Sequence, residues 1–493
     1  MPFVTGPLPQ RLKLVHGFGA VAFGVKDSGF SFFLLPFYNL VLGVDASTVG
    51  AALAAALVID ALVDPLIGHL SDRTYTKWGR RLPWLYLAPW PLALVWTMLW
   101  SPPFTGTPGF WDIVALAVGV RLLLSACEVP SVSLVPEITD DYDDRTTLFR
   151  YRFLSGWLGG LLMMVLTFTV FLPTPQSQLQ PEGYASYGLF GAALIALSVI
   201  GSAAAQHRIV AQLPERRPPP FSITGAFAEI FDAFREKAFV IFALGGLAAY
   251  VLQGMTFSIT QYVNLYVWQF SELAFQLYPA VLFLSVVLMF VIVGPLHRRW
   301  GKPKSAALGA LVGLAFYCSP YVFYLAGAWP TVGTTASTAL LYGFLVCANT
   351  ASVVAIISAT SMVAEIVEAF EERTGQRAEG TFYAGNWLVQ KCATGGGILL
   401  TSLIVQSIDL APGTPQAEIA PETVRQLVWL FMLAATVLAS IAAFWLARFP
   451  ISREQHEARV VARRGRPAPP APATADPLDQ AVRADPDAHT ITP

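Results

Sequence analysis

About twelve apolar stretches, most of them 20 residues or longer, run through the sequence and are separated by short polar segments. Each stretch is long enough to cross the hydrocarbon core of a bilayer, which is about 30 Å thick. Charged residues make up only 13% of the 493 residues, about half the share of an average soluble domain. A stretch of this length satisfies its own backbone hydrogen bonds in lipid only as a helix. The sequence therefore predicts an all-α membrane protein with twelve transmembrane helices.

The spans and the basic loops together predict how the chain is organised. The expected spans are residues 14–42, 48–72, 82–101, 110–136, 150–172, 185–211, 238–266, 275–297, 304–327, 333–365, 380–407 and 425–449. Lys and Arg are concentrated in alternate loops, so the positive-inside rule predicts that both termini face the cytoplasm. The expected domains are an N-terminal six-helix bundle (1–211), a cytoplasmic linker with an amphipathic helix (212–237), a C-terminal six-helix bundle (238–450) and a disordered tail (451–493).

Two aspartates, Asp60 and Asp64, lie in the middle of the second apolar stretch. Placing a carboxylate there costs about 2.5 to 3.5 kcal/mol on an insertion scale. A residue that is this costly in the membrane is expected to have a function. Residues four apart lie on one helix face, where two carboxylates can share one cation, one proton or one basic partner. This pattern predicts the ion-coupling site of a secondary transporter. The alternative is a buried structural salt bridge with Lys391.

Further ionisable residues lie within the expected spans, and such residues are functional candidates by default. They are Lys26, Asp27, Arg121, Glu128, Arg152 and Lys391. Each also has a structural interpretation. Glu128 and Arg152 could neutralise each other, and Lys26 could pair with its neighbour Asp27. Arg121 could snorkel toward the membrane surface or contact a helix end.

Three sequence blocks resemble one transporter family. They are DALVDPLIGHLSDRTYTKWGRRLPWLYLAPWP, EVPSVSLVPEITDDYDDRTTLFRYRF and SMVAEIVEAFEERTGQRAEGTFYAGNWLVQK. The blocks resemble the glycoside-pentoside-hexuronide:cation symporters, the melibiose-carrier branch of the major facilitator superfamily. This branch also contains the sodium-dependent lysophospholipid transporters. The resemblance runs from about residue 10 to 450 and implies the major facilitator fold, with two bundles of six helices.

The resemblance implies a cation site built from Asp60 and Asp64, with the Ser125 hydroxyl as a further ligand. It also implies that Lys391 is a resident countercharge that occupies the site when the ion has left. Melibiose-type members have an asparagine just before the second aspartate, where this chain has Val63. Alkali cations prefer several oxygen ligands, whereas a proton needs one carboxylate, so both Na⁺ and H⁺ remain candidate coupling ions.

The resemblance places a solute-binding pair at Glu128 and Arg152, whose side chains accept from and donate to sugar hydroxyls. Lys26, Asp27 and Trp387 are further candidates for solute contacts. The family's first-span acid aligns with Gly24, and its two stacking tryptophans align with Val132 and Ile356. Lysophospholipid carriers lack much of the same polar set, but they also lack an acid at the position of Glu128. The pocket therefore lies between the two patterns.

Charged residues in the basic loops resemble the cytoplasmic gate of the superfamily. The gate residues proposed from the sequence are Asp72, Arg73, Arg80, Arg81, Arg145, Glu365 and Arg377, with Glu137, Asp140, Asp141 and Glu368 as candidate partners. Ion pairs among them would close the inner side and break when the bundles rock. The alternative is a set of solvated loops.

The sequence thus predicts a secondary active transporter that couples Na⁺ or H⁺ to symport of a sugar or glycoside by alternating access. The alternative is a sodium-dependent carrier of lysophospholipids or other amphiphiles on the same scaffold. An enzyme is not expected, because the sequence has no HExxH motif, metal-ligand spacing or nucleophile–base pair that can be placed. No cofactor besides the coupling ion and no nucleic-acid partner is expected. The predicted location is the bacterial inner membrane, with a monomer as the working unit.

Overall fold

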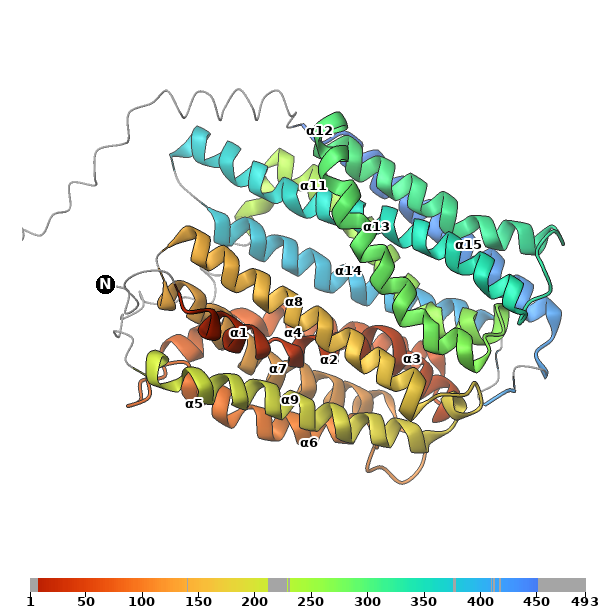
Figure 1. Cartoon of the computed structure of the whole chain (residues 1–493), viewed down its shortest axis with the longest axis horizontal. Helices are drawn as coiled ribbons and strands as arrows, with labels where there is room; N and C mark the ends of the chain where they lie inside the picture. The colour runs from red at the N-terminus through yellow and green to blue at the C-terminus, as the bar shows by residue number, and fades with distance from the viewer. Residues whose placement is uncertain are drawn as a thin grey trace, which may run out of the picture. The chain divides into compact units, whose positions relative to one another are not determined.

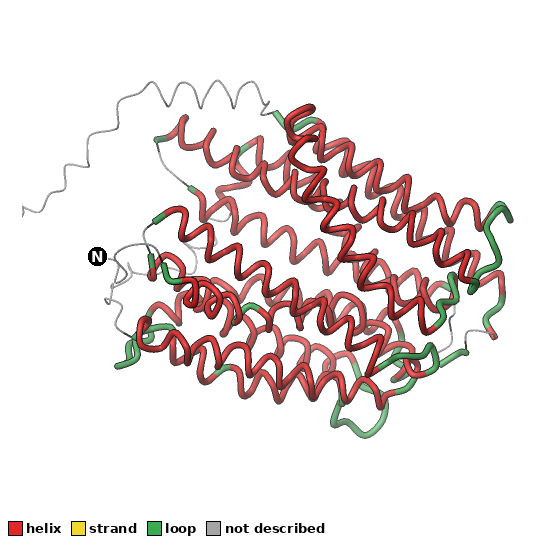
Figure 2. Tube along the Cα trace, viewed as in Figure 1, coloured by secondary structure: helices red, strands yellow, loops and turns green. Residues whose placement is uncertain are grey.

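The computed structural model describes residues 8–139, 141–211, 228, 231–375, 378–408, 410, 413–415 and 418–450. Throughout this part of the chain the regular elements are helices (Figure 2). Most of the expected linker (212–237) and the tail (451–493) lie outside the described residues. The candidate gate residue Arg377 and the candidate partner Asp140 also lie outside them.

The N-terminal half of the chain, up to Ala211, forms a bundle of helices (Figure 1). Its helices are α1 (Gln10–Phe18), α2 (Val21–Ser28), α3 (Leu34–Pro36), α4 (Ala46–Asp72), α5 (Leu82–Leu87), α6 (Pro89–Trp100), α7 (Phe110–Ile138), α8 (Tyr142–Leu166) and α9 (Pro181–Val210). Short π-helical turns at Gly29–Phe33, Phe37–Val41 and Thr167–Phe171 continue the first and fifth spans. In this half, α4 packs on α7 and α2 packs on α8.

The C-terminal half contains fewer but longer helices. They are α11 (Lys237–Tyr262), α12 (Glu272–Leu325), α13 (Thr335–Thr374), α14 (Glu379–Ser407) and α15 (Pro421–Ala447). A π-helical turn at Val263–Val267 continues α11. Here α12 packs along α13, and α11 packs on α14.

Ten helical segments of the described chain are long and apolar enough to cross a membrane. The pair α5–α6 supplies the expected third span, and α12 is two spans joined at Gly301, where the backbone leaves helical geometry at φ 73°. Counted in this way, the described helices match the twelve predicted spans, so the predicted fold class is confirmed. Two boundaries were wrong: α8 begins at Tyr142 rather than at 150, and α13 continues to Thr374 rather than ending at 365. Polar and charged residues can also form a helix outside the membrane. The apolar run therefore marks only the part of each helix that lies in lipid.

The first span lies very close to α8. A side chain at Gly24 would collide with the backbone of Gly156 and Gly160, and one at Gly159 would meet Val21. Small residues of this kind let helix backbones approach closely in membranes, where packing rather than the hydrophobic effect joins helices. The α2–α8 contact therefore requires glycine at position 24.

The two halves meet along α4 and α14. Gly50 lies against Ser402, and Gly395 lies against Ala54 and Leu57. Near the ends of the first and seventh spans, the Tyr262 hydroxyl donates to Asn39 Oδ1 at 2.9 Å. The contacts of Gly50, Ala54 and Leu57 lie along the part of α4 that is remote from the basic loop after Asp72.

Candidate functional site

Asp60 and Asp64 project from the middle of α4 and face two basic side chains. Asp60 Oδ2 lies 3.0 Å from Arg121 Nη1 of α7 and 2.9 Å from Lys391 Nζ of α14. Asp64 Oδ2 lies 2.5 Å from the same Lys391 Nζ. With two carboxylates and two cations, this four-residue cluster, which we call the central cluster, carries no net charge.

The other oxygen of each carboxylate faces Ser125 on α7. Ser125 Oγ lies 2.7 Å from Asp64 Oδ1 and 3.2 Å from Asp60 Oδ1. A hydroxyl has a single proton and can donate it to only one of the two carboxylates at a time. Three oxygens therefore converge here while the two basic groups approach from the Oδ2 side. This arrangement suits a small cation, with further ligands supplied from elsewhere.

Arg121 has a position that the sequence interpretation did not anticipate. We considered snorkelling or a helix-end contact, but the side chain is only 7% exposed and is paired with Asp60, whose side chain is 6% exposed. The guanidinium carbon also lies 4.6 Å from the centre of the Phe30 ring, within cation–π distance. The helical spacing could have revealed this role, because Arg121 and Ser125 are four residues apart and share a face of α7.

Lys391 is the contribution of the C-terminal half to the central cluster. Its side chain is 26% exposed, and that of Asp64 is 31% exposed, so the Lys391–Asp64 pair is more open than the Arg121–Asp60 pair. Because α4 and α14 belong to different halves, this contact depends on how the halves meet, whereas the Arg121 contact lies within one half.

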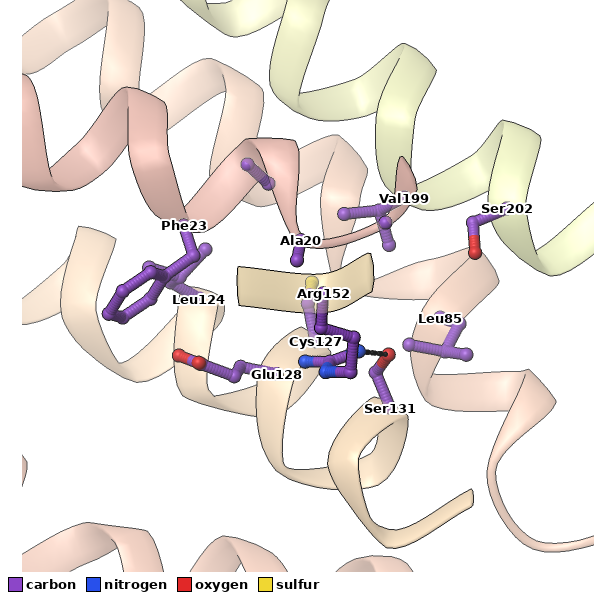
Figure 3. Close-up of a pocket in the computed structure, with 12 residues that line it drawn as sticks. Ala20, Phe23, Leu85, Leu124, Cys127, Glu128, Ser131, Arg152, Val199 and Ser202 are labelled. Atoms are coloured by element: carbon purple, nitrogen blue, oxygen red, sulfur yellow. Dashed lines mark hydrogen bonds between the residues drawn. The ribbon is translucent and has the colours of Figure 1, made fainter. Parts of the chain in front are cut away.

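Glu128 and Arg152 do not form the ion pair that we considered as a structural alternative. Arg152 Nη1 instead donates to Ser131 Oγ at 2.6 Å. The Glu128 carboxylate is turned away from the guanidinium (Figure 3) and forms no ion pair or side-chain hydrogen bond with the described residues. The carboxylate is thus available to a donor from outside the protein, and Ser131 is a contact residue that the sequence interpretation missed.

A small cavity of about 20 Å³ lies beside Arg152 inside the N-terminal half. Polar and apolar side chains line it, including Glu128, Cys127, Ser131 and Ser202 (Figure 3). This volume holds about one water molecule and is too small for a sugar. Any solute that contacts Glu128 must therefore occupy space outside this cavity.

The remaining candidates for solute contacts are Lys26, Asp27 and Trp387, and they lie in two different places. Lys26 Nζ lies 2.6 Å from Asp27 Oδ1, so the local pair is present, and it lies 4.2 Å from the centre of the Phe23 ring. Trp387 on α14 is 56% exposed and is not among the residues that line the cavity. The packing of Gly24 against α8 explains why the acid of the sugar carriers cannot occupy that position.

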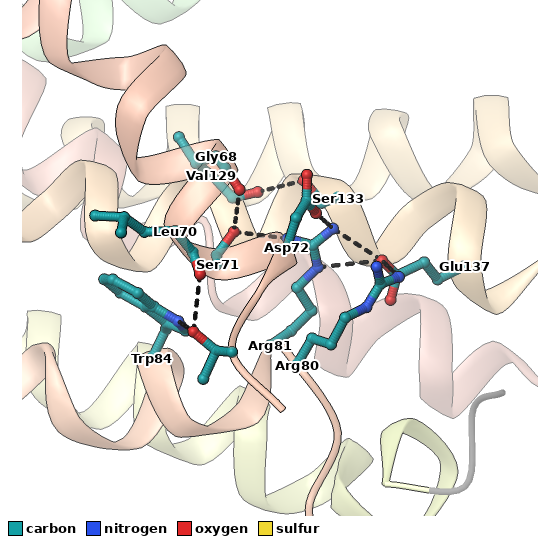
Figure 4. Close-up of polar contacts among 11 residues, drawn as sticks. Gly68, Leu70, Ser71, Asp72, Arg80, Arg81, Trp84, Val129, Ser133 and Glu137 are labelled. Atoms are coloured by element: carbon teal, nitrogen blue, oxygen red, sulfur yellow. Dashed lines mark hydrogen bonds and ion pairs between the residues drawn. The ribbon is translucent and has the colours of Figure 1, made fainter. Parts of the chain in front are cut away.

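Charged residues after the second span form what we call the N-terminal basic cluster, consisting of Asp72, Arg80, Arg81 and Glu137 (Figure 4). Arg80 and Arg81 both reach Glu137 Oε1 on α7, each at 2.9 Å. Arg81 also pairs with Asp72 and donates to Ser71 Oγ at 2.6 Å. The cluster joins the end of α4 to the end of α7 within one half.

A simpler contact follows the eighth span. Lys302 Nζ lies 2.9 Å from Glu365 Oε1 of α13, which is 7% exposed, and we call these two residues the C-terminal basic pair. The tenth expected span ends at residue 365, and α13 continues past it to Thr374, so Glu365 lies within this helix. Of the other candidate gate residues, Arg145 Nε donates to the Thr139 carbonyl at 2.8 Å, and Arg73 follows the last residue of α4.

Comparison with known proteins identifies the family. The family model described as "MFS/sugar transport protein" matches residues 15–453. The chain belongs to this family. In the described residues, the order of the helices and the basic residues that follow the second and eighth spans agree with that assignment.

Relatives in this MFS sugar-transport family include symporters. The chain is 28% identical to an uncharacterized symporter of Synechocystis sp. over 90% of this chain and 94% of that protein. It is 30% identical to the isoprimeverose transporter of Lactiplantibacillus pentosus, over 32% of this chain and 33% of that protein. The fold also matches a bacterial homologue of the human lysosomal transporter Spinster in an inward-facing, unoccupied conformation, with a TM-score of 0.64, 14% identity, and coverage of 89% of this chain and 96% of the other. The protein is therefore an integral, multi-pass membrane transporter rather than an enzyme.

Proposed function

We propose that the protein is a cation-coupled symporter that carries a sugar or glycoside by alternating access. The observation that carries the proposal is the central cluster, in which two carboxylates and Ser125 converge inside the membrane beside a lysine from the other half. A coupling cation, Na⁺ or H⁺, would bind on the Ser125 side of the carboxylates. Relatives that are named symporters support this assignment.

Lys391 links ion binding to movement of the halves. In the described conformation its ammonium bridges Asp60 and Asp64, which satisfies both carboxylates without a coupling ion. A bound cation makes this bridge unnecessary and frees α14 to move relative to α4. Moving one charge through a potential of 100 mV gains about 2.3 kcal/mol, enough for roughly fifty-fold accumulation of a neutral solute.

The solute would bind near Glu128 and Arg152, in the space between the halves. Glu128 offers two carboxylate oxygens as acceptors for hydroxyl groups, and Arg152 keeps donors beyond the one that Ser131 uses. Lys26, Asp27 and Trp387 are further candidates for contacts with the solute. A polyhydroxylated solute matches this mixture of acceptors and donors. The resemblance to the isoprimeverose transporter points to the same chemical class.

The proposal includes a topology. The basic loops would face the cytoplasm of a bacterial inner membrane, which places both termini there. Residues 1–211 and 238–450 would move as two bundles tethered by 212–237, with 451–493 as a tail. The N-terminal basic cluster and the residues Arg73, Arg145, Glu365 and Arg377 would take part in closing the inner side. One chain contains both halves of the path, so a monomer suffices.

The test is the melting temperature of the detergent-purified protein with isoprimeverose, other glycosides, uronides and lysophospholipids, each in sodium buffer and in sodium-free buffer. A ligand that binds only the folded state raises the melting temperature by mass action. We expect a glycoside to stabilise the protein. Stabilisation that grows with sodium identifies the coupling ion, and stabilisation that is independent of sodium favours H⁺. If no sugar of the panel stabilises the protein, the solute assignment is wrong.

A lysophospholipid or similar amphiphile is the second candidate. It is favoured by Val132 and Ile356, which give apolar surface at positions where the sugar carriers have tryptophan. Stabilisation by lysophospholipids alone would assign the protein to that class, with Glu128 and Arg152 as headgroup contacts.

A further inference from the structure

The two basic residues of the central cluster differ in what holds them in place. Arg121 on α7 and Asp60 on α4 belong to the same half and remain neighbours when the halves move. The pair is almost fully buried, and Phe30 of the same half lies against the guanidinium. Lys391 reaches the aspartates from α14 of the other half. Only the Lys391 contact can therefore be made and broken as the halves rearrange.

We propose that Arg121 is a positioning residue that permanently cancels the charge of Asp60, so that the cation-free carrier has a neutral centre and can reorient. The inference rests on the proposed symport function and assigns a role to a residue outside the expected cation site. Asp64 is then the carboxylate whose charge is balanced in turn by the coupling cation and by Lys391. Each cycle exchanges one monovalent cation for the lysine.

The charges of the four side chains support this assignment. With Arg121 present, two carboxylates face two cations in the cation-free state, and the sum is zero. Without Arg121, the same state would carry one uncompensated buried negative charge, which is costly in a membrane interior. The loaded state of such a variant would carry the same uncompensated charge, because the coupling cation has then taken the place of Lys391 beside Asp64. Loss of Arg121 should therefore impair the movement of both the empty and the loaded carrier.

The direct test compares two fluxes in the same proteoliposomes with Arg121→Gln. Net uptake requires the empty carrier to return, whereas equilibrium exchange uses only the loaded carrier. We would measure both with labelled isoprimeverose, with cation present on both sides for exchange. The expected result for Arg121→Gln is a fall of both fluxes by at least about tenfold. The charge-conserving Arg121→Lys should keep both fluxes within about threefold of the unsubstituted protein.

Unchanged fluxes in a folded Arg121→Gln protein would overturn the inference. A fall in Arg121→Lys as large as in Arg121→Gln would overturn it as well, because a merely structural role of the arginine predicts that result. If the unsubstituted protein carries out neither flux with isoprimeverose or with any other glycoside of the panel, the proposed function fails instead, so the two failures are distinguishable.

A second variant covers the case in which Arg121→Gln does not fold. Asp60→Asn combined with Arg121→Gln removes both members of the buried pair, which is less disruptive than leaving one charge unpaired. The cation-free centre is then Asp64 and Lys391 alone and is again neutral. Asp60→Asn alone is the matched comparison, because it loses the same carboxylate but leaves Arg121 unpaired. We expect both fluxes to be at least about tenfold higher in the double variant than in Asp60→Asn alone. Equal fluxes in these two variants would contradict the charge argument.

Discussion

Both halves of the transporter turn from an even-numbered span into the next span in the same way. In the N-terminal half the turn is Trp78-Gly79-Arg80, and in the C-terminal half it is Trp300-Gly301-Lys302. Both glycines have left-handed backbone angles, with φ of 83° and 73°. The basic side chain that follows each glycine reaches a glutamate on the helix of the span two further along the chain.

The halves differ in how much charge they attach to this shared turn. In the N-terminal basic cluster two arginines share Glu137, and Asp72 and Ser71 also take part. In the C-terminal basic pair one lysine meets one glutamate. The same difference holds in the membrane interior, where the central cluster takes three charged residues from the N-terminal half and Lys391 alone from the C-terminal half. The backbone turn is thus common to both halves, and the ionic chemistry is concentrated in one.

Asp64→Asn should have the largest effect of the substitutions that test this difference between the halves. If the N-terminal half contains the coupling chemistry, this change removes the carboxylate that exchanges partners, and uphill accumulation falls from up to about fifty-fold to none. The measurement is concentrative uptake of the identified solute into vesicles under an imposed potential. Asp45→Asn is the matched control, because Asp45 is exposed just before the same helix, and it should leave accumulation unchanged. Undiminished accumulation in Asp64→Asn would remove coupling from the central cluster.

The fold could be predicted almost completely from the sequence, because long apolar runs and loop charges report directly on lipid. The boundaries that were wrong, at Tyr142 and Thr374, are those where a helix continues into water. Side chains must be apolar only where the helix is surrounded by lipid. In water the helix can continue with polar side chains, so the end of the apolar run does not mark the end of the helix. Close packing was also not predictable: that Gly24 lies against α8 follows from which two helices are neighbours.

The sequence predicted which residues form the candidate site, but it did not predict which of them contact one another. Buried charges stood out against the apolar background, but the sequence left open whether Glu128 and Arg152 pair with each other. In the structure Arg152 donates to Ser131 instead. The sequence also left Arg121 without a partner, although Arg121 meets Asp60. Partner choice depends on how helices are rotated and where each lies in the bundle. A one-dimensional pattern does not contain that information.

Lys391→Gln tests the contribution of the C-terminal half, with a smaller expected effect than Asp64→Asn. Asp60 keeps Arg121, but Asp64 loses its basic partner in the cation-free state. Net uptake should fall by about tenfold while exchange is retained, because a buried carboxylate without a partner is costly only in the empty carrier. Lys391→Arg, which keeps the charge, is the control. If Lys391→Gln abolished accumulation and Asp64→Asn did not, the coupling chemistry would belong to the C-terminal half.

Glu137→Gln and Glu365→Gln compare the two basic contacts directly. Glu137 serves two arginines and Glu365 serves one lysine, so each change should cost about 1 to 3 kcal/mol of stability, with the larger loss at Glu137. The melting temperatures of the two purified variants provide the measurement, with Glu272→Gln, at an exposed helix start, as a neutral control. Equal losses in the two variants would mean that the extra arginine adds nothing to the N-terminal basic cluster.

The smallest expected effects come from the glycines of the shared turn. A Cβ in the left-handed region costs about 1 kcal/mol, so Gly79→Ala and Gly301→Ala should lower the melting temperature by similar small amounts. Gly294→Ala is the matched control: this glycine lies inside α12 with open space around it, and alanine there favours the helix by up to about 1 kcal/mol. The control should therefore shift the melting temperature in the opposite direction. Loss at Gly79 without loss at Gly301 would show that the two turns differ in backbone as well as in charge, and the halves would then share less than their sequences suggest.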